Sequence, residues 1–512
     1  MKIELNEQFR RALDLMENSR RNVFITGKAG TGKSTLLNYF RQTTKKKIAV
    51  LAPTGVAAVN IQGQTIHSFF GFKPDITTGK IKKNAYIDYD LYNALDAIVI
   101  DEISMVRADL LDCVDKFLRI ARSKNKPFGG VQMIFIGDLY QLPPVVTGRE
   151  REIFRSHYKS QYFFDSNAFN GLETEFVELE KIYRQKDEEF IRILNAVRNN
   201  TVTDREVCEI NKRLAPDFRP RKNEFYITLT TTNDLADEVN EKELSKISAK
   251  EFYYTGKIKG NFDKSTLPTE INLKVKVGAQ IMLLNNDLNG RWINGSVGKI
   301  TGIRRDGKKD TILAELRDGR TVDVEPYTWK MFNLVYNKDT KTLDSETTGS
   351  FTQYPIRLAW AVTIHKSQGK TFDNVIIDLG KGTFSHGQVY VALSRCTSIN
   401  GIVLKKPVSK KHIFMDWKIV KFLTSFQYDL SEKKLSAGDK VKVIEDAIRN
   451  KTRLSIVYLK SNDEKSKRIV QPKTVGKMQY NGREFLGVEA YCFSRKEDRV
   501  FRVDRILEME EA

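Results

Sequence analysis

Short apolar runs that end in polar or glycine-rich residues recur through the N-terminal part of the chain. The first run, residues 23–26, leads into a glycine-rich segment and then into a helical pattern at 35–40. Similar runs occur at 48–52, 97–100 and 131–136. Buried strands that alternate with helices predict a parallel, doubly wound α/β sheet whose polar strand ends share one edge.

The same alternation restarts further along the chain, with predicted strands at 225–229 and 375–379. Between about 250 and 350 it gives way to short strands and turns, which favours a small inserted β-barrel. We therefore predict two α/β lobes, residues 1–172 and 173–430, with the barrel inserted into the second lobe.

Four smaller segments complete the predicted organisation. Residues 5–17 have helical periodicity, with Asn6 as the expected N-cap. Residues 71–92 are polar and lysine-rich and are predicted to form a surface insertion. The small, charged residues at 431–440 are typical of a linker, and residues 441–512 are expected to form a compact unit of one helix followed by strands.

The composition limits the classes of protein to which this chain can belong. The chain has 512 residues, a formal net charge of +20 and a pI near 9.5, which favours a polyanionic partner such as nucleic acid. No apolar run approaches the roughly 20 residues of a membrane-spanning helix, so no membrane partner is expected. The four cysteines are widely scattered, which argues against a disulfide framework or a zinc site. Together with the lack of a signal-peptide pattern, this predicts a cytoplasmic location.

The glycine-rich segment after the first strand reads GKAGTGKS, residues 27–34. It matches the phosphate-loop pattern G-x-x-x-x-G-K-[ST] between a strand and a helix, which is the structural setting that the pattern requires. Glycines let the backbone N–H groups approach an anion, and the helix N-terminus adds its dipole. Lys33 is expected to reach the outer phosphates and Ser34 to hold Mg²⁺, so the segment predicts a nucleoside triphosphate site.

Two carboxylates, Asp101 and Glu102, follow the apolar run at 97–100. Acids at the end of a buried strand are costly unless they face a metal or a polar site. Hydrolysis of a phosphoanhydride requires one carboxylate near Mg²⁺ and another to orient or deprotonate water. Gln141, which follows the run at 131–136, could sense the terminal phosphate from the same sheet edge.

Histidine and arginine residues near other strand ends allow more than one interpretation. An isolated histidine such as His67 is more often a structural hydrogen-bonding residue than a ligand. Arg184 and Arg395 lie near the ends of elements in the second lobe, where they could supply positive charge to a site between lobes. A surface ion pair is the commoner role of an arginine.

Taken together, the motifs in about the first 430 residues resemble superfamily 1B helicases, most closely the Pif (petite integration frequency) DNA helicases. The matching segments, in chain order, are LNEQ, GKAGTGKS, APTGVAAVNIQGQTIHSFFG, IDEISM, GDLYQLPPV, LEKIYRQKDEEFIRILNAVR, AWAVTIHKSQGKTFD and VALSRCTS. RecD-type helicases share the general set, but APTGVAAVNIQG and GDLYQLPPV favour the Pif type. NGSVGKI falls where the family has an inserted SH3-like barrel.

This resemblance implies two RecA-like lobes with ATP and Mg²⁺ between them. It implies that Gln8 contacts adenine, that Ser34 and Asp101 hold Mg²⁺, and that Glu102 activates water. The remaining phosphate-contacting residues that it implies are Gly27, Ala29, Gly30, Thr31, Gly32, Lys33, Thr35 and Gly369, with Gln141, Arg184 and Arg395 responding to the γ-phosphate. The DNA contacts that it implies are Pro53, Thr54, Gly55, Asn60, His67, Thr363, His365, Lys366 and Ser367.

The C-terminal segment 441–512 resembles a WYL domain. Residues 455–459, Pro472 and the closing FRVDRI carry the resemblance, whereas Val457 stands at the position of the family's tryptophan. Such domains usually act as regulatory or nucleic-acid-sensing modules, so Arg502 and Arg505 are candidate contacts by analogy. A role in stability or oligomerisation is an equal alternative on fold analogy alone.

The function predicted from the sequence is an ATP-dependent DNA helicase that moves 5′-to-3′ along single-stranded DNA and separates duplexes that carry such a tail. The polarity comes from the family resemblance, and the 71–92 insertion is the expected wedge. G-quadruplex DNA and RNA–DNA hybrids are further candidate substrates, and a monomer is the favoured assembly. Two rival interpretations are a translocase that does not separate strands and a nucleic-acid-binding regulator with a vestigial ATPase.

Overall fold

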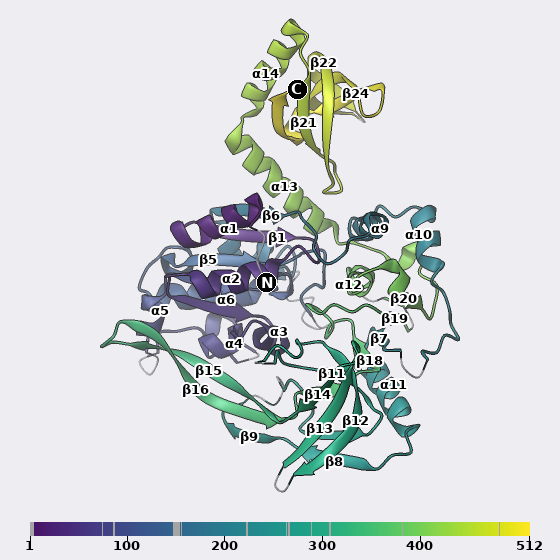
Figure 1. Cartoon of the computed structure of the whole chain (residues 1–512). Coiled ribbons are helices and arrows are strands. Elements are labelled where there is room, and N and C mark those ends of the chain that lie inside the picture. The colour runs from purple at the N-terminus through teal and green to yellow at the C-terminus, as the bar shows by residue number, and fades with distance from the viewer. Residues whose placement is uncertain are drawn as a thin grey trace. The chain divides into compact units, whose positions relative to one another are not determined.

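A computed structural model describes residues 5–512 except 74, 85–87, 147–153, 155, 222–223, 263, 265–266, 288, 307–308, 381, 384 and 481. For residues 56, 59, 60, 306, 309, 333 and 345 it describes the backbone only. The chain divides into two compact units. One comprises Met1–Arg198 with Val202–Phe414, and the other comprises Asn199–Thr201 with Met415–Ala512 (Figure 1).

The first lobe is built on a six-stranded parallel sheet in the order β3-β2-β4-β5-β1-β6. Its strands are β1 (Asn22–Gly27), β2 (Ile48–Ala52), β3 (Gln64–Thr65), β4 (Ala97–Ile100), β5 (Gln132–Ile136) and β6 (Thr174–Leu179). Every residue of β4 and β5 is buried, as continuous apolar runs in a doubly covered sheet require. The predicted parallel α/β sheet is confirmed.

The boundary between the lobes differs from the predicted residue 173. Strand β6 pairs in parallel with β1 along its whole length, from Asn22 opposite Thr174 to Gly27 opposite Leu179. It therefore closes the sheet of the first lobe instead of opening the second. Pairing partners distant in sequence decide this, so the apolar pattern of β6 alone could not assign the strand to one lobe.

The helices of the first lobe are α1 (Glu7–Asn18), α2 (Lys33–Thr43), α3 (Gly55–Asn60), α4 (Ile66–Phe70), α5 (Asp90–Ala94), α6 (Ala108–Ala121) and α8 (Asn167–Asn170). Asn6 caps α1 as predicted, because its side-chain oxygen accepts a hydrogen bond from the Phe9 N–H at 2.9 Å. Phe9, Ala12 and Met16 lie on the buried face of α1, at the spacing of one helical stripe.

The second lobe has a four-stranded parallel sheet in the order β18-β7-β19-β20. Its strands are β7 (Ile227–Thr230), β18 (Ala361–Thr363), β19 (Val375–Asp378) and β20 (Ile402–Leu404). Its helices are α9 (Glu188–Arg198), α10 (Asp204–Asn211), α11 (Asn233–Ser245) and α12 (Gln388–Ser394). All seven residues of α12 are buried, which places it inside the unit.

The predicted β-barrel insertion contains an antiparallel sheet in the order β14-β13-β12-β11-β17. Its strands are β11 (Gln280–Leu283), β12 (Val297–Asp306), β13 (Lys309–Leu316), β14 (Thr321–Val324) and β17 (Ile356–Leu358). Beside it lie two smaller sheets, one formed by β8 (Glu251–Thr255) and β10 (Asn272–Lys276), the other by β9 (Lys257–Gly260), β15 (Tyr327–Asn337) and β16 (Thr342–Gln353). The insertion extends past residue 350, because β17 pairs with β11.

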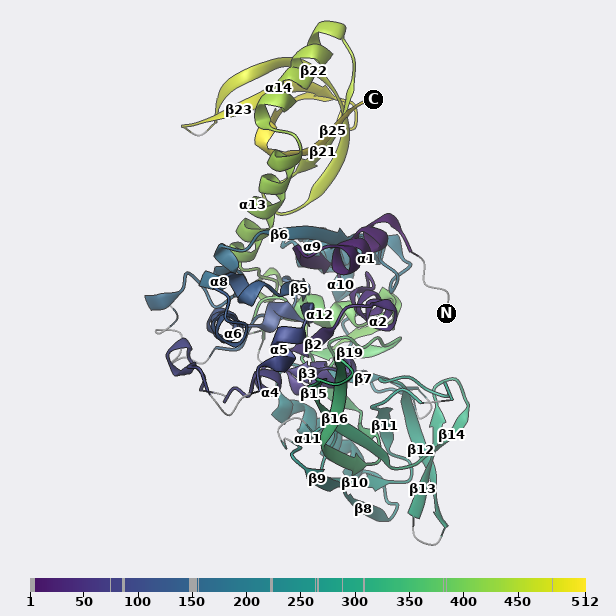
Figure 2. The same cartoon turned by 90° about the vertical axis from the view of Figure 1, so that its left-hand side faces the viewer.

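The long hairpin of β15 and β16 reaches the first lobe, which the sequence did not indicate. Lys338 forms an ion pair with Asp90 on α5, and the Lys47 ammonium lies 5.2 Å from the centre of the Tyr336 ring. Figure 1 shows this hairpin alongside α5, and Figure 2 shows β15 beside β3. Helix α5 begins within the predicted 71–92 wedge, of which residues 74 and 85–87 lie outside the described part.

The C-terminal unit begins with α13 (Trp417–Lys434) and α14 (Ala437–Asn450). An antiparallel sheet in the order β24-β23-β22-β21-β25 follows. Its strands are β21 (Leu454–Leu459), β22 (Lys465–Tyr480), β23 (Arg483–Cys492), β24 (Glu497–Arg502) and β25 (Ile506–Glu511).

The predicted linker at 431–440 is wrong, because most of these residues are helical. Ser431 donates to the carbonyls of Ile506 and Leu507 at 3.0 and 2.8 Å, and the buried Lys440 ammonium lies 2.9 Å from the Ser431 hydroxyl. These buried contacts give polar residues a structural role that their composition conceals.

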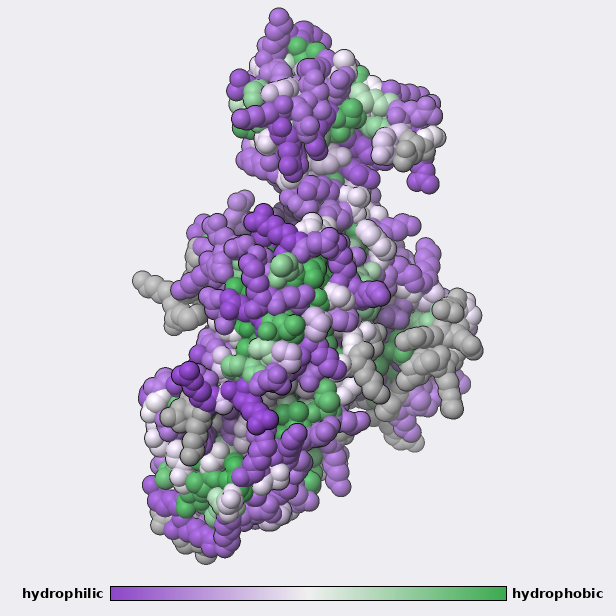
Figure 3. All heavy atoms as spheres, turned by 90° about the vertical axis from the view of Figure 1, so that its right-hand side faces the viewer, coloured by the Kyte–Doolittle hydropathy of each residue, from purple (hydrophilic) through white to green (hydrophobic). Residues whose placement is uncertain are grey.

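No helix within the described ranges is long and apolar enough to cross a membrane. Hydrophilic residues predominate on the face drawn in Figure 3. This accords with the 150 charged residues of the chain, 85 Lys or Arg plus 65 Asp or Glu.

The buried contacts of α13 predict that a fragment comprising 415–512 is more stable than one comprising 441–512. The shorter fragment loses the Ser431 contacts and the 2.7 Å bond from Gln427 to Asp463. At about 1 kcal/mol per net hydrogen bond, the midpoint of thermal unfolding should fall by roughly 10 °C or more, as measured by circular dichroism. Equal midpoints for the two fragments would show that α13 contributes nothing to this unit.

Candidate functional site

The loop between β1 and α2 adopts a backbone that requires glycine. Gly30 and Gly32 have φ values of 84° and 89°. A Cβ atom on Gly30 would lie 2.6 Å from the Cβ of Arg184, and one on Gly27 would lie 2.6 Å from the Leu179 carbonyl oxygen. The loop is therefore packed against the end of β6 and the segment that follows it, and side chains at these glycines would push them apart.

Lys33 lies at the start of α2 and folds back over the loop. Its ammonium donates to the carbonyls of Gly27 and Lys28 at 2.7 and 3.0 Å. Burial lowers the pKa of Lys33, and the nearby Asp138 and Glu102 carboxylates oppose that shift. The hydroxyl of Thr31 is directed into the loop, donating to the Lys28 carbonyl at 2.9 Å.

A cavity of about 650 Å³ opens above this loop and takes its walls from both lobes. Its lining residues are Phe9, Ala29, Gly30, Gly32, Lys33, Ser34, Thr35, Glu102, Gln141, Tyr183, Arg184, Gly369, Thr371 and Arg395. The structure thus brings together most of the phosphate-contacting residues predicted from the sequence.

Two aromatic residues of this cavity were not singled out from the sequence. A Cβ atom on Gly32 would lie 3.1 Å from the ring of Phe9, and the Tyr183 N–H donates to the Gly30 carbonyl at 2.9 Å. Tyr183 is 39% exposed, so its ring is accessible from solvent. Its position directly before Arg184 was the available signal. Gln8 is half-buried and does not line the cavity, so its contact with adenine stays a prediction.

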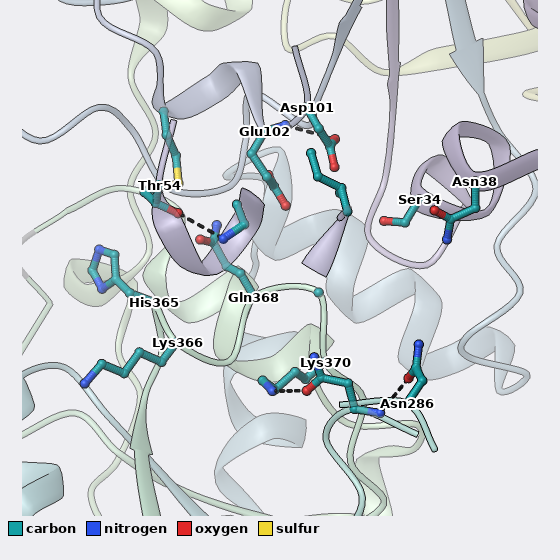
Figure 4. A pocket seen from close by; sticks show the side chains of 15 residues that line it. Ser34, Asn38, Thr54, Asp101, Glu102, Asn286, His365, Lys366, Gln368 and Lys370 are labelled. Atoms are coloured by element: carbon teal, nitrogen blue, oxygen red, sulfur yellow. Dashed lines mark hydrogen bonds between the residues drawn. The ribbon is translucent and has the colours of Figure 1, made fainter. Parts of the chain in front are cut away.

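The carboxylates Asp101 and Glu102 follow β4, and Asp101 accepts a 2.9 Å hydrogen bond from the Glu102 N–H. Burial, and then repulsion from Glu102, raise the pKa of Asp101 to about 7. Burial also raises the pKa of Glu102. Figure 4 shows both side chains and Ser34 facing a second cavity, of about 400 Å³. Hard oxygen donors grouped in this way suit Mg²⁺.

The two predicted arginines meet in the structure. Arg184 donates to the Ser394 carbonyl at 3.1 Å, and Arg395 donates to the Val391 carbonyl and the Ser394 hydroxyl, each at 3.0 Å. Burial, and then repulsion from Arg184, lower the pKa of Arg395 to about 9. A bound polyphosphate would relieve this repulsion, so the pair is suited to an anion.

The structure contains a buried polar network centred on Asp138 that the sequence pattern did not predict. Asp138 is fully buried, and its carboxylate lies 3.6 Å from the Arg198 guanidinium. The Tyr390 hydroxyl donates to Asp138 at 3.3 Å and accepts from the Ala29 N–H at 2.8 Å. Gln141 also donates to Asp138, at 3.2 Å. The network joins the phosphate loop to α9 and α12. The signal available in the sequence was an acid two residues after the apolar run of β5.

The predicted DNA contacts are only partly assembled. Thr54, His365 and Lys366 line the second cavity, together with Gly369. Pro53 and Gly55 flank Thr54, and Gly55 is the first residue of α3. The Asn60 side chain lies outside the described part.

Three other predicted DNA contacts lie elsewhere. His67, on α4, lines neither cavity, and burial lowers its pKa. Thr363 is buried, and its hydroxyl accepts from the Lys366 N–H at 3.2 Å. Ser367 is fully buried, and its hydroxyl donates to the Ile364 carbonyl at 2.7 Å. Ser367 therefore presents no side chain to DNA in this structure.

In the C-terminal unit the two candidate arginines are half-buried. Arg502 donates to both oxygens of Asp504, at 3.0 and 2.6 Å, and its guanidinium lies 5.4 Å from the centre of the Phe485 ring. Arg502 is therefore already paired, whereas the role of Arg505 stays a prediction.

These features define a class: a P-loop ATPase with two RecA-like lobes and its nucleotide cavity between them. A family model described as PIF1-like helicase matches residues 4–207, and a WYL domain model matches residues 439–511. The ATP-dependent DNA helicase Pif1 of Bdellovibrio bacteriovorus is 32% identical over 444 residues, which cover 83% of this chain and 93% of that protein. The chain belongs to the PIF1-like helicases, a family of ATP-dependent DNA helicases.

Other relatives agree with this assignment. The human ATP-dependent DNA helicase PIF1 is 34% identical over 400 residues, which cover 74% of this chain but only 58% of the human protein. The structure of Bacteroides sp Pif1 in complex with ADP-AlF4 matches with a TM-score of 0.76 and 36% identity, covering 84% of this chain and 98% of that one. The same helicase bound to single-stranded DNA matches with a TM-score of 0.61 and 38% identity, covering 82% and 96%.

The position of Glu102 predicts that Glu102→Gln binds ATP but hydrolyses it slowly. The amide keeps the shape of the side chain and cannot accept a proton from water, so kcat should fall by roughly 10²- to 10⁴-fold. Steady-state hydrolysis and a nucleotide titration measure the two effects separately. Glu188→Gln, at an exposed position on α9, is the matched control. Hydrolysis at the wild-type rate would exclude Glu102 as the base.

The raised pKa of Asp101 predicts a pH-dependent cost to stability. Between its ordinary pKa of 3.8 and about 7, the unfolded chain releases this proton while the folded chain retains it. The free energy of unfolding therefore falls as the pH rises through that window, and it stays lower above it. Asp101→Asn should raise the thermal midpoint of the nucleotide-free protein at about pH 8, and much less at about pH 4.

Calorimetry at both pH values tests this prediction, with and without MgATP. The variant should also lose the stabilisation that MgATP gives the wild type, because Asp101 is a predicted metal ligand. An unchanged or lower midpoint at the higher pH would contradict the proposed burial cost.

Proposed function

We propose that this chain is an ATP-driven DNA helicase that moves 5′-to-3′ along single-stranded DNA. The observation that carries the proposal is the nucleotide cavity, which takes its phosphate loop from one lobe and Arg395 from the other. A cavity shared in this way couples nucleotide binding to the relative position of the lobes. Differential affinity of each lobe for DNA would then convert that movement into steps.

The residues present fit ATP and Mg²⁺. The Lys33 ammonium donates to two carbonyls of the loop. Bound phosphates would replace these carbonyls as its hydrogen-bond partners. The Ser34 hydroxyl and the Asp101 carboxylate would hold the metal ion, and Glu102 would accept a proton from the attacking water. When bound, MgATP supplies the phosphoanhydride and the charge that polarises it. Arg184, Arg395 and Gln141 would stabilise the charge that develops on the γ-phosphate.

Tyr183 and Phe9 are aromatic residues that line the cavity beside Gly32, and we propose that they hold the base. The Tyr183 hydroxyl accepts from the Asn6 side chain at 3.2 Å, which restricts the ring. Gln8, the neighbour of Phe9 on α1, is retained as the proposed adenine contact. An exposed ring beside a glycine-lined loop provides a stacking surface for a planar base.

Single-stranded DNA is the proposed partner. The net charge of +20 supports a polyanion, and Thr54, His365 and Lys366 line one cavity from both lobes. We propose that the 71–92 segment, braced by the Lys338–Asp90 ion pair, is the wedge that separates the strands. G-quadruplex DNA and RNA–DNA hybrids are included as substrates. The four cysteines are free thiols, which supports the cytoplasmic location that completes the proposal.

For the C-terminal unit we propose a regulatory role that involves nucleic acid, with Arg502 and Arg505 as contacts. The match to a WYL domain model supports this role. The bidentate Arg502–Asp504 pair favours the alternative, a structural role, for Arg502 itself.

Strand separation on tailed duplexes is the decisive measurement. With MgATP, a duplex that carries a 5′ single-stranded tail should be unwound, and the same duplex with a 3′ tail should not. Lys33→Ala should abolish unwinding of the 5′-tailed duplex, because the proposed phosphate contact is lost. DNA-stimulated ATP hydrolysis without unwinding on either duplex would replace the helicase with the translocase. Unwinding from the 3′ tail alone would reverse the proposed polarity.

A further inference from the structure

The segment 369–373, which follows the TIHKSQ motif, is paired with the segment that carries Arg395. The Phe372 N–H donates to the Arg395 carbonyl at 2.9 Å, and the Thr397 N–H donates to the Phe372 carbonyl at 3.1 Å. The Arg395 guanidinium also lies 3.4 Å from the Lys370 carbonyl oxygen. A displacement of 369–373 would therefore displace the arginine that faces the nucleotide cavity.

The β-barrel insertion holds the other side of this segment. The Lys370 ammonium donates to the side-chain oxygen of Asn294 at 2.9 Å, and the Asn294 N–H donates to the Asn286 side chain at 2.8 Å. Figure 4 shows Lys370 and Asn286 on the same side of the second cavity. An added Cβ on Gly295 would lie 3.6 Å from the Lys370 side chain, so the barrel loop packs against the lysine stem as well.

A second barrel contact reaches the same segment from a different strand. Arg317, just after β13, forms an ion pair with Asp373. Asp373 in turn accepts a 3.2 Å hydrogen bond from the Thr397 hydroxyl. The Arg317 side chain is 40% exposed and the Asp373 side chain 58%. Because solvent weakens an exposed ion pair, this contact holds the segment less firmly than the Lys370 contact that faces the cavity.

Lys370 is costly to keep charged at this position. Its side chain is half-buried, and burial, followed by repulsion from Arg357, lowers its pKa to about 8. The Asn294 oxygen compensates part of that cost, which makes the contact stronger than an exposed hydrogen bond.

We propose that the Lys370–Asn294 hydrogen bond is a positioning contact through which the barrel holds segment 369–373, and with it Arg395, in place for ATP hydrolysis. Lys370 and Asn294 act through Arg395 and do not touch the reacting atoms. The position of the barrel would thereby affect the nucleotide site. This inference rests on the proposed ATPase function. Any partner that shifts the barrel would change the hydrolysis rate through this contact.

The test is a double-mutant cycle on the full chain, with Lys370→Met, Asn294→Ala and the double variant. Misplacing a catalytic group by about 1 Å costs up to roughly 100-fold, so each single variant should lower the kcat of DNA-stimulated ATP hydrolysis by roughly 10-fold or more. The KM for ATP and the affinity for ADP should change by less than about 2-fold, because nucleotide binding rests on the phosphate loop. The double variant should be no worse than either single variant, since all three lack the same bond.

Two controls separate positioning from a general defect. Lys370→Arg retains a donor and should recover most of the wild-type kcat. Asn289→Ala removes the same side chain from an exposed position of the same barrel loop and should leave kcat unchanged. Variants that lose ADP binding or unfold early, without rescue by Lys370→Arg, would overturn the proposal in favour of a structural role.

Multiplicative losses in the double variant would also overturn it, because they would show that Lys370 and Asn294 act independently, as expected if Lys370 contacts DNA or phosphate directly. Single variants that keep the wild-type kcat would also overturn the proposal. If the wild type hydrolyses ATP but separates no strands, the proposed helicase function fails while this cycle still reports on the contact. Loss of all hydrolysis in the wild type would refute the proposed function itself.

Discussion

The nucleotide cavity is built from charges that the protein cannot neutralise efficiently by itself. On one lobe, burial raises the pKa of Asp101 to about 7 and also raises that of Glu102. Lys33 lies on the same lobe, and burial lowers its pKa. Burial likewise lowers the pKa of Arg184, and burial followed by repulsion from Arg184 lowers that of Arg395 to about 9. Taking such charges out of water is expensive unless they are paired. A metal–polyphosphate complex carries positive charge for the carboxylates and negative charge for the lysine and arginines, so its binding compensates both groups of buried charges at once. The strand ends, the loop glycines and the position of α12 all serve this arrangement.

The buried network around Asp138 explains how the two lobes share the cavity. The Tyr390 hydroxyl on α12 bridges the Ala29 N–H of the phosphate loop and the Asp138 carboxylate, while Arg198 on α9 lies on the other side of Asp138. A polar group buried in this way is costly to separate from its partners, so the network acts as a fixed point between lobes. Arg395 caps the same short helix that carries Tyr390.

The inserted elements attach to the motor at specific polar contacts. The barrel meets segment 369–373 through Asn294 and Arg317, and the β15–β16 hairpin meets the first lobe at Asp90. An insertion that touches both lobes can report the state of one lobe to the other, whereas an insertion joined only by its two chain ends could not. In the C-terminal unit, the contacts of Ser431 and Lys440 show the same use of polar residues as internal supports.

The sequence by itself determined the local chemistry and the periodic elements. The glycine and lysine spacing at 27–34, the acids after β4, and the alternation of strands and helices each depend on residues close together in the chain, so local patterns were sufficient to predict them. Tertiary structure decided the features that depend on distant partners. Strand β6 belongs to the first sheet because it pairs with the edge of β1. Most of residues 431–440 are helical, and buried hydrogen bonds of Ser431 and Lys440 hold them in place. The Asp138 network and the Lys370–Asn294 contact could likewise not be predicted from the sequence pattern, because hydrogen-bond partners far apart in sequence leave no periodic signal.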